Sequence, residues 1–91
     1  MIEKRLWIRF KGRVQGVGFR YTAAHIAQSL GLTGWVENEY DGTVLCEVQG
    51  SGEDIDMFLG KLNNSRYIYI EDMDIKELAV DENERGFGIR G

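Results

Sequence analysis

A stretch with three glycines separates two different hydrophobic periods near the start of this 91-residue chain. It runs from Gly12 to Arg20, after a segment of strand-like alternation and before a helical pattern. Glycine lets backbone N–H groups turn toward a bound group without interference from a Cβ atom. A helix start adds unpaired N–H donors and the positive end of the helix dipole. The stretch therefore predicts an anion-binding turn, with the planar guanidinium of Arg20 as a further donor.

Hydrophobic periodicity predicts the elements on either side of this turn. Residues 5–11 alternate between apolar and polar side chains, which indicates a half-buried strand with Arg5 on its polar face. A helical pattern begins near Arg20, and Gly31 is a typical C-terminal stop. The glycine-rich turn is thus expected to connect a strand directly to a helix.

A second set of elements follows along the chain. Residues 33–38 and 43–49 favour two strands, joined by an Asp-Gly hairpin turn. Ser51 is the expected N-cap of a second helix with an apolar i, i+3, i+4, i+7 stripe. Residues 67–78 favour a fourth strand, whose alternation is interrupted at Glu71-Asp72. Either a β-bulge or a break would explain this interruption.

The resulting order is βαββαβ with an added C-terminal strand at residues 87–89. It predicts an α+β ferredoxin-like sandwich, with a mainly antiparallel sheet and two helices on one face, in a single domain over residues 1–91. In the usual strand order 4-1-3-2, the first two strands run in the same direction. Their ends, at Gly12 and Asn38, then lie on one edge of the sheet, roughly 9–10 Å apart. The fold would therefore bring Arg20 and Asn38 within reach of one ligand.

Composition limits the possible partners. Fifteen acidic and eleven basic residues give a net charge of −4, which argues against a general nucleic-acid binder. Cys46 is the sole cysteine and His25 the sole histidine, so neither a disulfide nor a soft-metal site is expected within the chain. No run of about 18 apolar residues indicates a membrane span. We expect a soluble, cytoplasmic monomer without a metal or other cofactor.

Two stretches of the sequence have the order and spacing of the motifs of a known family. The first is Gly12–Arg20 (GRVQGVGFR) and the second is Gly34–Val44 (GWVENEYDGTV), with Gly50 also in its expected place. Together they resemble the motifs of the acylphosphatase family. The resemblance covers nearly the whole chain in layout and is dense over residues 12–50.

This resemblance implies an enzyme that hydrolyses the carboxyl–phosphate bond of small acyl phosphates, giving a carboxylate and inorganic phosphate. It also implies that the reaction needs neither a metal nor a protein nucleophile. Carried over by position, Asn38 would orient the attacking water through its side-chain amide. The phosphate would be bound by Arg20 and by the backbone amides of Gln15, Gly16, Val17, Gly18 and Phe19.

Three features depart from the family pattern. Glu37 stands where a basic, amide or small side chain is more common, and its carboxylate would repel an anionic substrate unless it points away. Residues 64–66 replace a Gly-Pro-rich turn, so a looser entry to the fourth strand is expected. The chain also lacks a common C-terminal aromatic residue.

Other functions fit parts of the sequence. A non-catalytic module that binds phosphate would need the glycine-rich turn but not Asn38. A nucleic-acid-binding domain on the same scaffold would need an aromatic-rich sheet motif, which the sequence lacks. A fragment of a larger carbamoyl-transfer maturation protein would be expected to carry CxxC pairs, which are also missing. Hydrolysis of an acyl phosphate is the function that uses both stretches.

Overall fold

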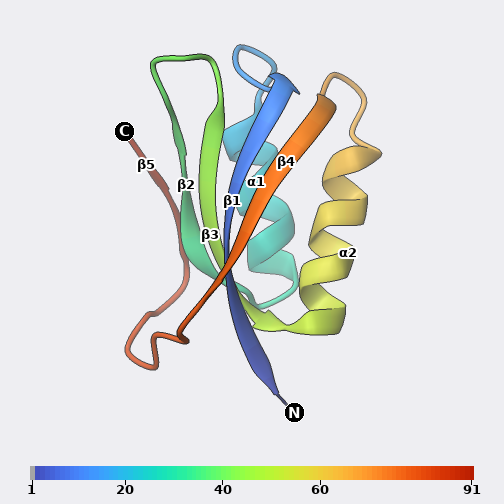
Figure 1. The fold of residues 1–91 in the computed structure, drawn as a ribbon. Helices are drawn as coiled ribbons and strands as arrows, with labels where there is room; N and C mark the ends of the chain where they lie inside the picture. The colour runs from blue at the N-terminus through green and yellow to red at the C-terminus, as the bar shows by residue number, and fades with distance from the viewer. Residues whose placement is uncertain (1) are drawn as a thin grey trace.

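Strands and helices follow one another in the order that the hydrophobic periodicity predicts (Figure 1). The computed structural model describes residues 2–91. The strands are β1 (Glu3–Arg13), β2 (Thr33–Asn38), β3 (Val44–Ser51), β4 (Tyr69–Leu78) and β5 (Phe87–Arg90), and the helices are α1 (Phe19–Ser29) and α2 (Gly52–Asn63).

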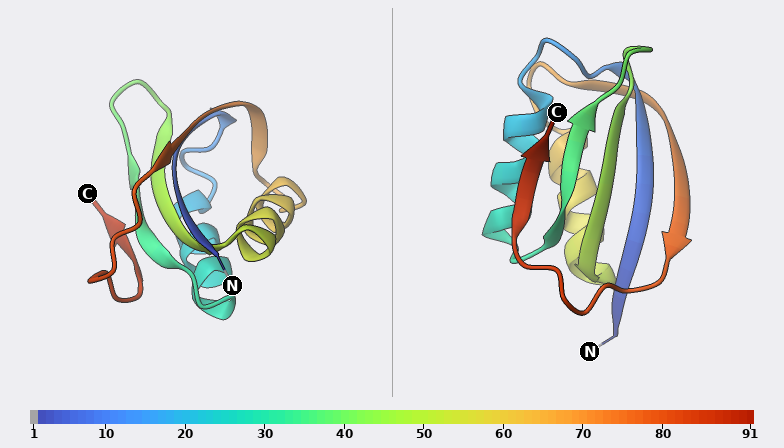
Figure 2. Two further views of the ribbon diagram at one scale, coloured as in Figure 1. Left: turned by 60° about the horizontal axis from the view of Figure 1, so that its bottom comes forward. Right: turned by 90° about the vertical axis from the view of Figure 1, so that its left-hand side faces the viewer.

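The strands form a five-stranded sheet of order β4-β1-β3-β2-β5. Neighbouring strands are antiparallel except for β5, which pairs in parallel with β2. Both helices cover the same face of the sheet (Figure 2). The predicted ferredoxin-like α+β sandwich and its 4-1-3-2 strand order are therefore confirmed. The added strand extends the sheet beyond β2.

The core lies between this face of the sheet and the two helices. Alternate residues of β1 such as Ile8 and Phe10 are fully buried, as the two-residue period predicts. The predicted stripe on α2 supplies Ile55, Phe58 and Leu62, which are also buried. The ring of Phe10 packs against the first residue of α1, with 4.9 Å between the ring centroids of Phe10 and Phe19. This contact fixes the start of α1 against the sheet.

The fourth strand differs from its predicted start. It begins at Tyr69 rather than residue 67, because residues 66 and 67 form a turn. The interruption in its alternation is a bulge: Lys11 pairs with Asp72 and Gly12 with Ile70, which leaves Glu71 as the extra residue. Gly12 has φ +128°, and a Cβ atom there would overlap the carbonyl oxygen of Tyr69. This glycine lets β1 run past the bulge into the glycine-rich turn.

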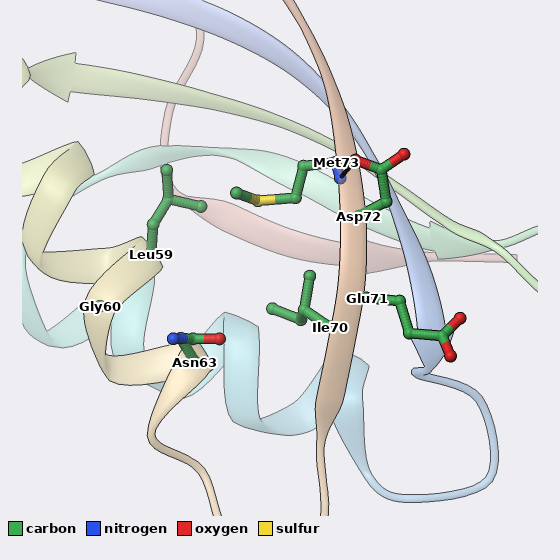
Figure 3. Close-up of a pocket in the computed structure, with 7 residues that line it drawn as sticks. All are labelled: Leu59, Gly60, Asn63, Ile70, Glu71, Asp72 and Met73. Carbon is green, nitrogen blue, oxygen red and sulfur yellow. Dashed lines mark hydrogen bonds between the residues drawn. The ribbon is translucent and has the colours of Figure 1, made fainter.

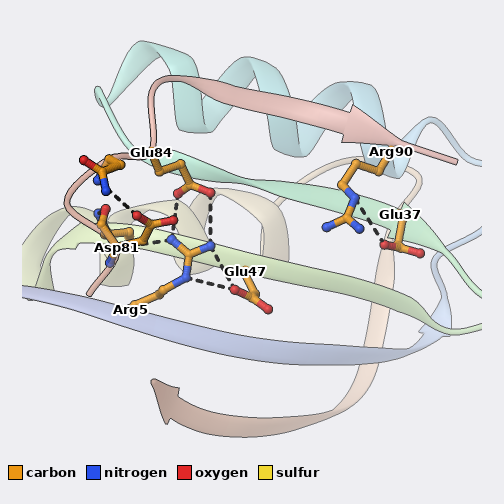
Figure 4. A network of polar contacts seen from close by, with 8 residues as sticks. Arg5, Glu37, Glu47, Asp81, Glu84 and Arg90 are labelled. Atoms are coloured by element: carbon orange, nitrogen blue, oxygen red, sulfur yellow. Dashed lines mark hydrogen bonds and ion pairs between the residues drawn. The ribbon is translucent and has the colours of Figure 1, made fainter. Parts of the chain in front are cut away.

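The outer face of the sheet, opposite the helices, carries one deeply buried charge. Arg5 lies on the polar face as predicted, yet only 5% of its surface is exposed. Residues 79–86 cross this face between β4 and β5 and cover Arg5 (Figures 2 and 4). The guanidinium donates to Glu47, Gln49 and Glu84, with both nitrogens Nη1 and Nη2 bonded to Glu84 at 2.7 and 3.0 Å.

Gln49 of β3 also forms hydrogen bonds with the crossing segment 79–86. Its Nε2 donates to the carbonyl of Asp81 at 2.9 Å, and its Oε1 accepts from the backbone N–H of Asp81 at 2.8 Å. Phe87 follows this segment and is buried in the core, where its ring centroid lies 6.1 Å from that of Phe58. Polar contacts on one face and an aromatic contact on the other therefore hold β5 against β2.

Candidate active site

One edge of the sheet brings the two motifs together. Phe10 of β1 and Asn38 of β2 both pair with Val44 of β3. The two strands therefore end at the same edge of the sheet, on either side of β3. A hollow of about 140 Å³ opens at this edge. It is lined by Val14, Gly16, Gly18, Phe19, Arg20, Tyr21 and Asn38. Arg20 and Asn38, predicted from separate stretches, thus border the same space.

The turn between β1 and α1 leaves its backbone donors free. Gly16 and Gly18 have φ of +73° and +77°, in the left-handed region that glycine adopts without strain. Within residues 2–91, no backbone hydrogen bond satisfies the N–H groups of residues 15–19. Buried Val14 and Phe19 anchor the two ends of the turn. Free amides at a helix start form an electropositive cradle.

Arg20 follows this cradle in the first turn of α1 and is half-buried. Its Nη1 donates to the main-chain oxygen O of Gly91 at 3.2 Å, and it forms no ion pair with an Asp or Glu side chain in the described range 2–91. The other donors of its planar fork are available for an anion. The contact with Gly91 therefore uses one donor of Arg20 and leaves the others free of hydrogen bonds within residues 2–91.

Asn38 carries a buried polar atom that the fold does not satisfy. Gly34 and Val36 are buried on the helix-facing side of β2, and strand alternation places Asn38 on the same side. Its Oδ1 is buried and has no hydrogen-bond partner within residues 2–91. An unsatisfied buried acceptor costs about 1–3 kcal/mol. A water molecule or ligand in the adjoining hollow would satisfy this oxygen.

Gln15 joins the cradle to the β2–β3 hairpin. Its side-chain Nε2 donates to the carbonyls of Glu39 and Thr43 at 2.7 and 2.8 Å. The hairpin is closed by a further bond, from the N–H of Glu39 to the carbonyl of Thr43 at 2.9 Å. Since Asn38 directly precedes this hairpin, Gln15 fixes one half of the site relative to the other. These two side-chain bonds could not be predicted from the sequence.

Glu37 points away from the hollow. It lies on the outer face of β2, where its Oε1 is 3.7 Å from Nε of Arg90 (Figure 4). Arg90 also stacks over Trp35, with its guanidinium carbon 4.2 Å from the ring centroid. Desolvation, and then a hydrogen bond with the Glu37 carboxyl, raises the pKa of Glu39 above its usual value. The carboxylate of Glu37, the residue that departs from the family pattern, therefore lies on the face of the sheet opposite to Asn38.

A larger hollow lies between α2 and β4 (Figure 3). Its volume is about 480 Å³, and its lining includes Glu71 and Asp72 but no lysine or arginine. Apolar Leu59, Ile70 and Met73 face the space, while the two carboxylates point out of it. A phosphate group would find no cation there, so this hollow does not fit the chemistry of the two motifs.

The remaining reactive side chains lie outside the site. Cys46 is fully buried in β3, and burial raises the pKa of its thiol far above the ordinary value. His25 is exposed on α1. Within residues 2–91, no group of three or more His, Cys, Asp or Glu side chains is arranged to hold a metal ion. No helix in the same range is long and apolar enough to cross a membrane.

Comparison with known proteins identifies the family. The acylphosphatase family model matches residues 6–89, which include the cradle, Arg20 and Asn38. The chain belongs to the acylphosphatase family. This is a family of enzymes.

Acylphosphatases from other organisms match nearly the whole of this chain. An acylphosphatase from Oceanobacillus iheyensis is 38% identical over 89 residues, covering 96% of this chain and 98% of that protein. One from Clostridium perfringens is 44% identical over 88 residues, covering 96% and 97%. The crystal structure of acylphosphatase from Bacillus subtilis has a TM-score of 0.89 at 32% identity, covering 97% of this chain and 99% of that one. This member therefore shares the family's fold from end to end.

Proposed function

We propose that this acylphosphatase hydrolyses small acyl phosphates in the hollow between the cradle and Asn38. The backbone amides of residues 15–19 and the guanidinium of Arg20 bind the phosphate, and Asn38 orients the attacking water. One observation carries the proposal: the buried Oδ1 of Asn38 has no partner within residues 2–91 and borders the same hollow as Arg20.

The chemistry requires few groups. The water oxygen forms a bond to phosphorus while the bond from phosphorus to the acyl oxygen breaks. One proton of the water passes to an oxygen of the phosphate group itself, so a carboxylate and inorganic phosphate are released. The leaving carboxylate is already stable, so neutralising the phosphoryl charge and fixing the water supply much of the rate. Arg20 and the free amides supply the positive potential. Asn38 Oδ1 accepts a hydrogen bond from the water and directs its lone pair toward phosphorus.

We also propose that residues 1–91 act as a single, cytoplasmic, monomeric domain. The one cysteine is buried in β3, as suits a protein that keeps its thiol reduced. The edge strand β4 carries Glu71, Asp72, Asp74 and Glu77, whose like charges oppose pairing with a second copy. Light scattering of the purified protein is expected to give the monomer mass, and a dimer mass would contradict this part of the proposal.

Turnover of benzoyl phosphate by the wild type and by Asn38→Ala tests the proposed roles. We expect the wild type to hydrolyse it and Asn38→Ala to lose about 10²–10³-fold in kcat, since one preorganised group is removed. The inhibition constant of inorganic phosphate is expected to stay within about threefold, because the cradle and Arg20 are intact. A folded wild type that binds phosphate without turnover would indicate a binding module instead.

A further inference from the structure

The hollow is small compared with sites that enclose drug-sized molecules. Sites that enclose a small molecule usually measure about 300–1,000 Å³, whereas this one measures about 140 Å³. If the phosphate occupies the space between Arg20 and Asn38, as proposed above, the acyl group must extend outward past the rim. The side chains at the rim then decide which acyl groups the enzyme favours.

The lining residues differ in what they can offer an acyl group. Gly16 and Gly18 have no side chain, and a Cβ atom on either would meet nothing within 4 Å. Val14 and Phe19 are 1% and 2% exposed, so they form the floor of the hollow and not its rim. Arg20 and Asn38 serve the phosphate and the water in the proposed mechanism. Of the lining residues, only Tyr21 then has a side chain free to contact the acyl group.

Tyr21 has the properties of a contact surface. It is 73% exposed, lines the hollow and lies directly after Arg20 in the first turn of α1. Long side chains on a helix lean toward its N-terminus, and the cradle directly precedes the N-terminus of α1. Within residues 2–91, its phenol makes no hydrogen bond that would hold the ring elsewhere.

We propose that the ring of Tyr21 packs against the acyl group of the bound substrate and favours acyl phosphates with a flat, apolar acyl group. This inference rests on the proposed function, because it assumes that the phosphate occupies the cradle. An aromatic acyl group gains a stacking contact with the Tyr21 ring, whereas a group as small as acetyl covers little of that ring.

The test compares kcat/KM for benzoyl phosphate and for acetyl phosphate. The enzymes are the wild type, Tyr21→Ala, Tyr21→Phe and a matched control, Tyr40→Ala. Tyr40 is fully exposed on the β2–β3 hairpin and does not line the hollow. The inhibition constant of inorganic phosphate is measured for each protein, since phosphate carries no acyl group and reports only on an intact cradle.

We expect Tyr21→Ala to lower the benzoyl-to-acetyl ratio of kcat/KM by about threefold to tenfold, the range of one aromatic contact. Tyr21→Phe keeps the ring and is expected to keep the ratio, and Tyr40→Ala is expected to leave it unchanged. Phosphate inhibition is expected to be the same in all four proteins. An unchanged ratio in Tyr21→Ala, or an equal fall in Tyr40→Ala, would overturn the inference. Neither result would affect the proposed roles of Arg20 and Asn38, which depend on turnover itself.

Discussion

Arg5 and Arg20 lie near opposite ends of β1, and they have opposite surroundings. Arg5 is 5% exposed and donates hydrogen bonds to Glu47, Gln49 and Glu84. Arg20 is half-buried and donates one hydrogen bond, to the main-chain oxygen O of Gly91. The hydrogen bonds that Arg5 donates to Glu84, foremost, raise the pKa of Arg5 above its ordinary value despite its burial. The fold uses the hydrogen-bond donors of Arg5, whereas Arg20 keeps donors that the fold does not use.

This difference shows how the same side chain serves stability in one place and binding in another. At Arg5 the crossing segment 79–86 supplies Glu84 and β3 supplies Glu47, and these two carboxylates compensate the cost of burying a charge. At Arg20 the neighbouring groups are unpaired amides and the buried, unsatisfied Oδ1 of Asn38. The edge of the sheet at Asn38 therefore combines unpaired backbone donors with an unsatisfied acceptor, as expected of a site that binds an anion and a water molecule.

Replacing Arg5 is expected to cause the largest loss of stability. Arg5→Leu leaves the carboxylates of Glu47 and Glu84 without their cation, and breaking a buried pair in this way costs about 3 kcal/mol or more. Urea denaturation measures the loss. Turnover per folded molecule is expected to stay near the wild-type value, because Arg5 is remote from the hollow.

Lys11→Leu is the matched control for this change. Lys11 and Asp74 form an ion pair at 3.2 Å with side chains 43% and 46% exposed. Exposed pairs contribute about 0–1 kcal/mol, so this variant is expected to stay close to the wild type. Equal stability losses in Arg5→Leu and Lys11→Leu would show that the buried cluster does not hold the crossing segment.

Replacing Gln15 is expected to lower turnover, because this side chain joins the cradle to the β2–β3 hairpin. Gln15→Met keeps the length of the side chain but removes both hydrogen bonds to the hairpin, each of which contributes about 1 kcal/mol. The hairpin and Asn38 are then free to shift relative to the cradle. We expect kcat for benzoyl phosphate to fall about tenfold, in line with the sensitivity of catalysis to small misplacements.

Gln28→Met is the control for Gln15→Met. Gln28 also donates a side-chain hydrogen bond to a backbone carbonyl, that of Phe87 at 3.1 Å, but on a part of α1 outside the hollow. It is expected to leave kcat unchanged. Turnover of Gln15→Met within twofold of the wild type would mean that the two halves of the site hold their positions without this link.

The fold followed from the sequence because its signals are local. Alternation over residues 5–11, the helical stripe of α2 and the Asp-Gly turn each depend on neighbours along the chain. The meeting of Arg20 and Asn38 could also be predicted, since strand order alone places both motifs on one edge. The family resemblance then supplied the chemistry expected of that edge.

What the sequence did not reveal depends on contacts between distant residues. Arg5 reads as an ordinary polar residue of a half-exposed strand, and only the crossing of residues 79–86 buries it. The bonds from Gln15 to the hairpin join residues 24 and 28 positions apart. Glu37 looked capable of repelling a substrate, and its place on the outer face beside Arg90 became clear only from the structure.

The most direct test makes the same substitution at both arginines. Lysine keeps the charge but removes the planar fork, which a point charge cannot replace at a bidentate site. For Arg20→Lys we predict a loss of about 10²–10³-fold in kcat/KM for benzoyl phosphate with unchanged stability. For Arg5→Lys we predict lower stability with unchanged turnover per folded molecule. Near-normal turnover in Arg20→Lys would contradict the assignment of this arginine to the phosphate.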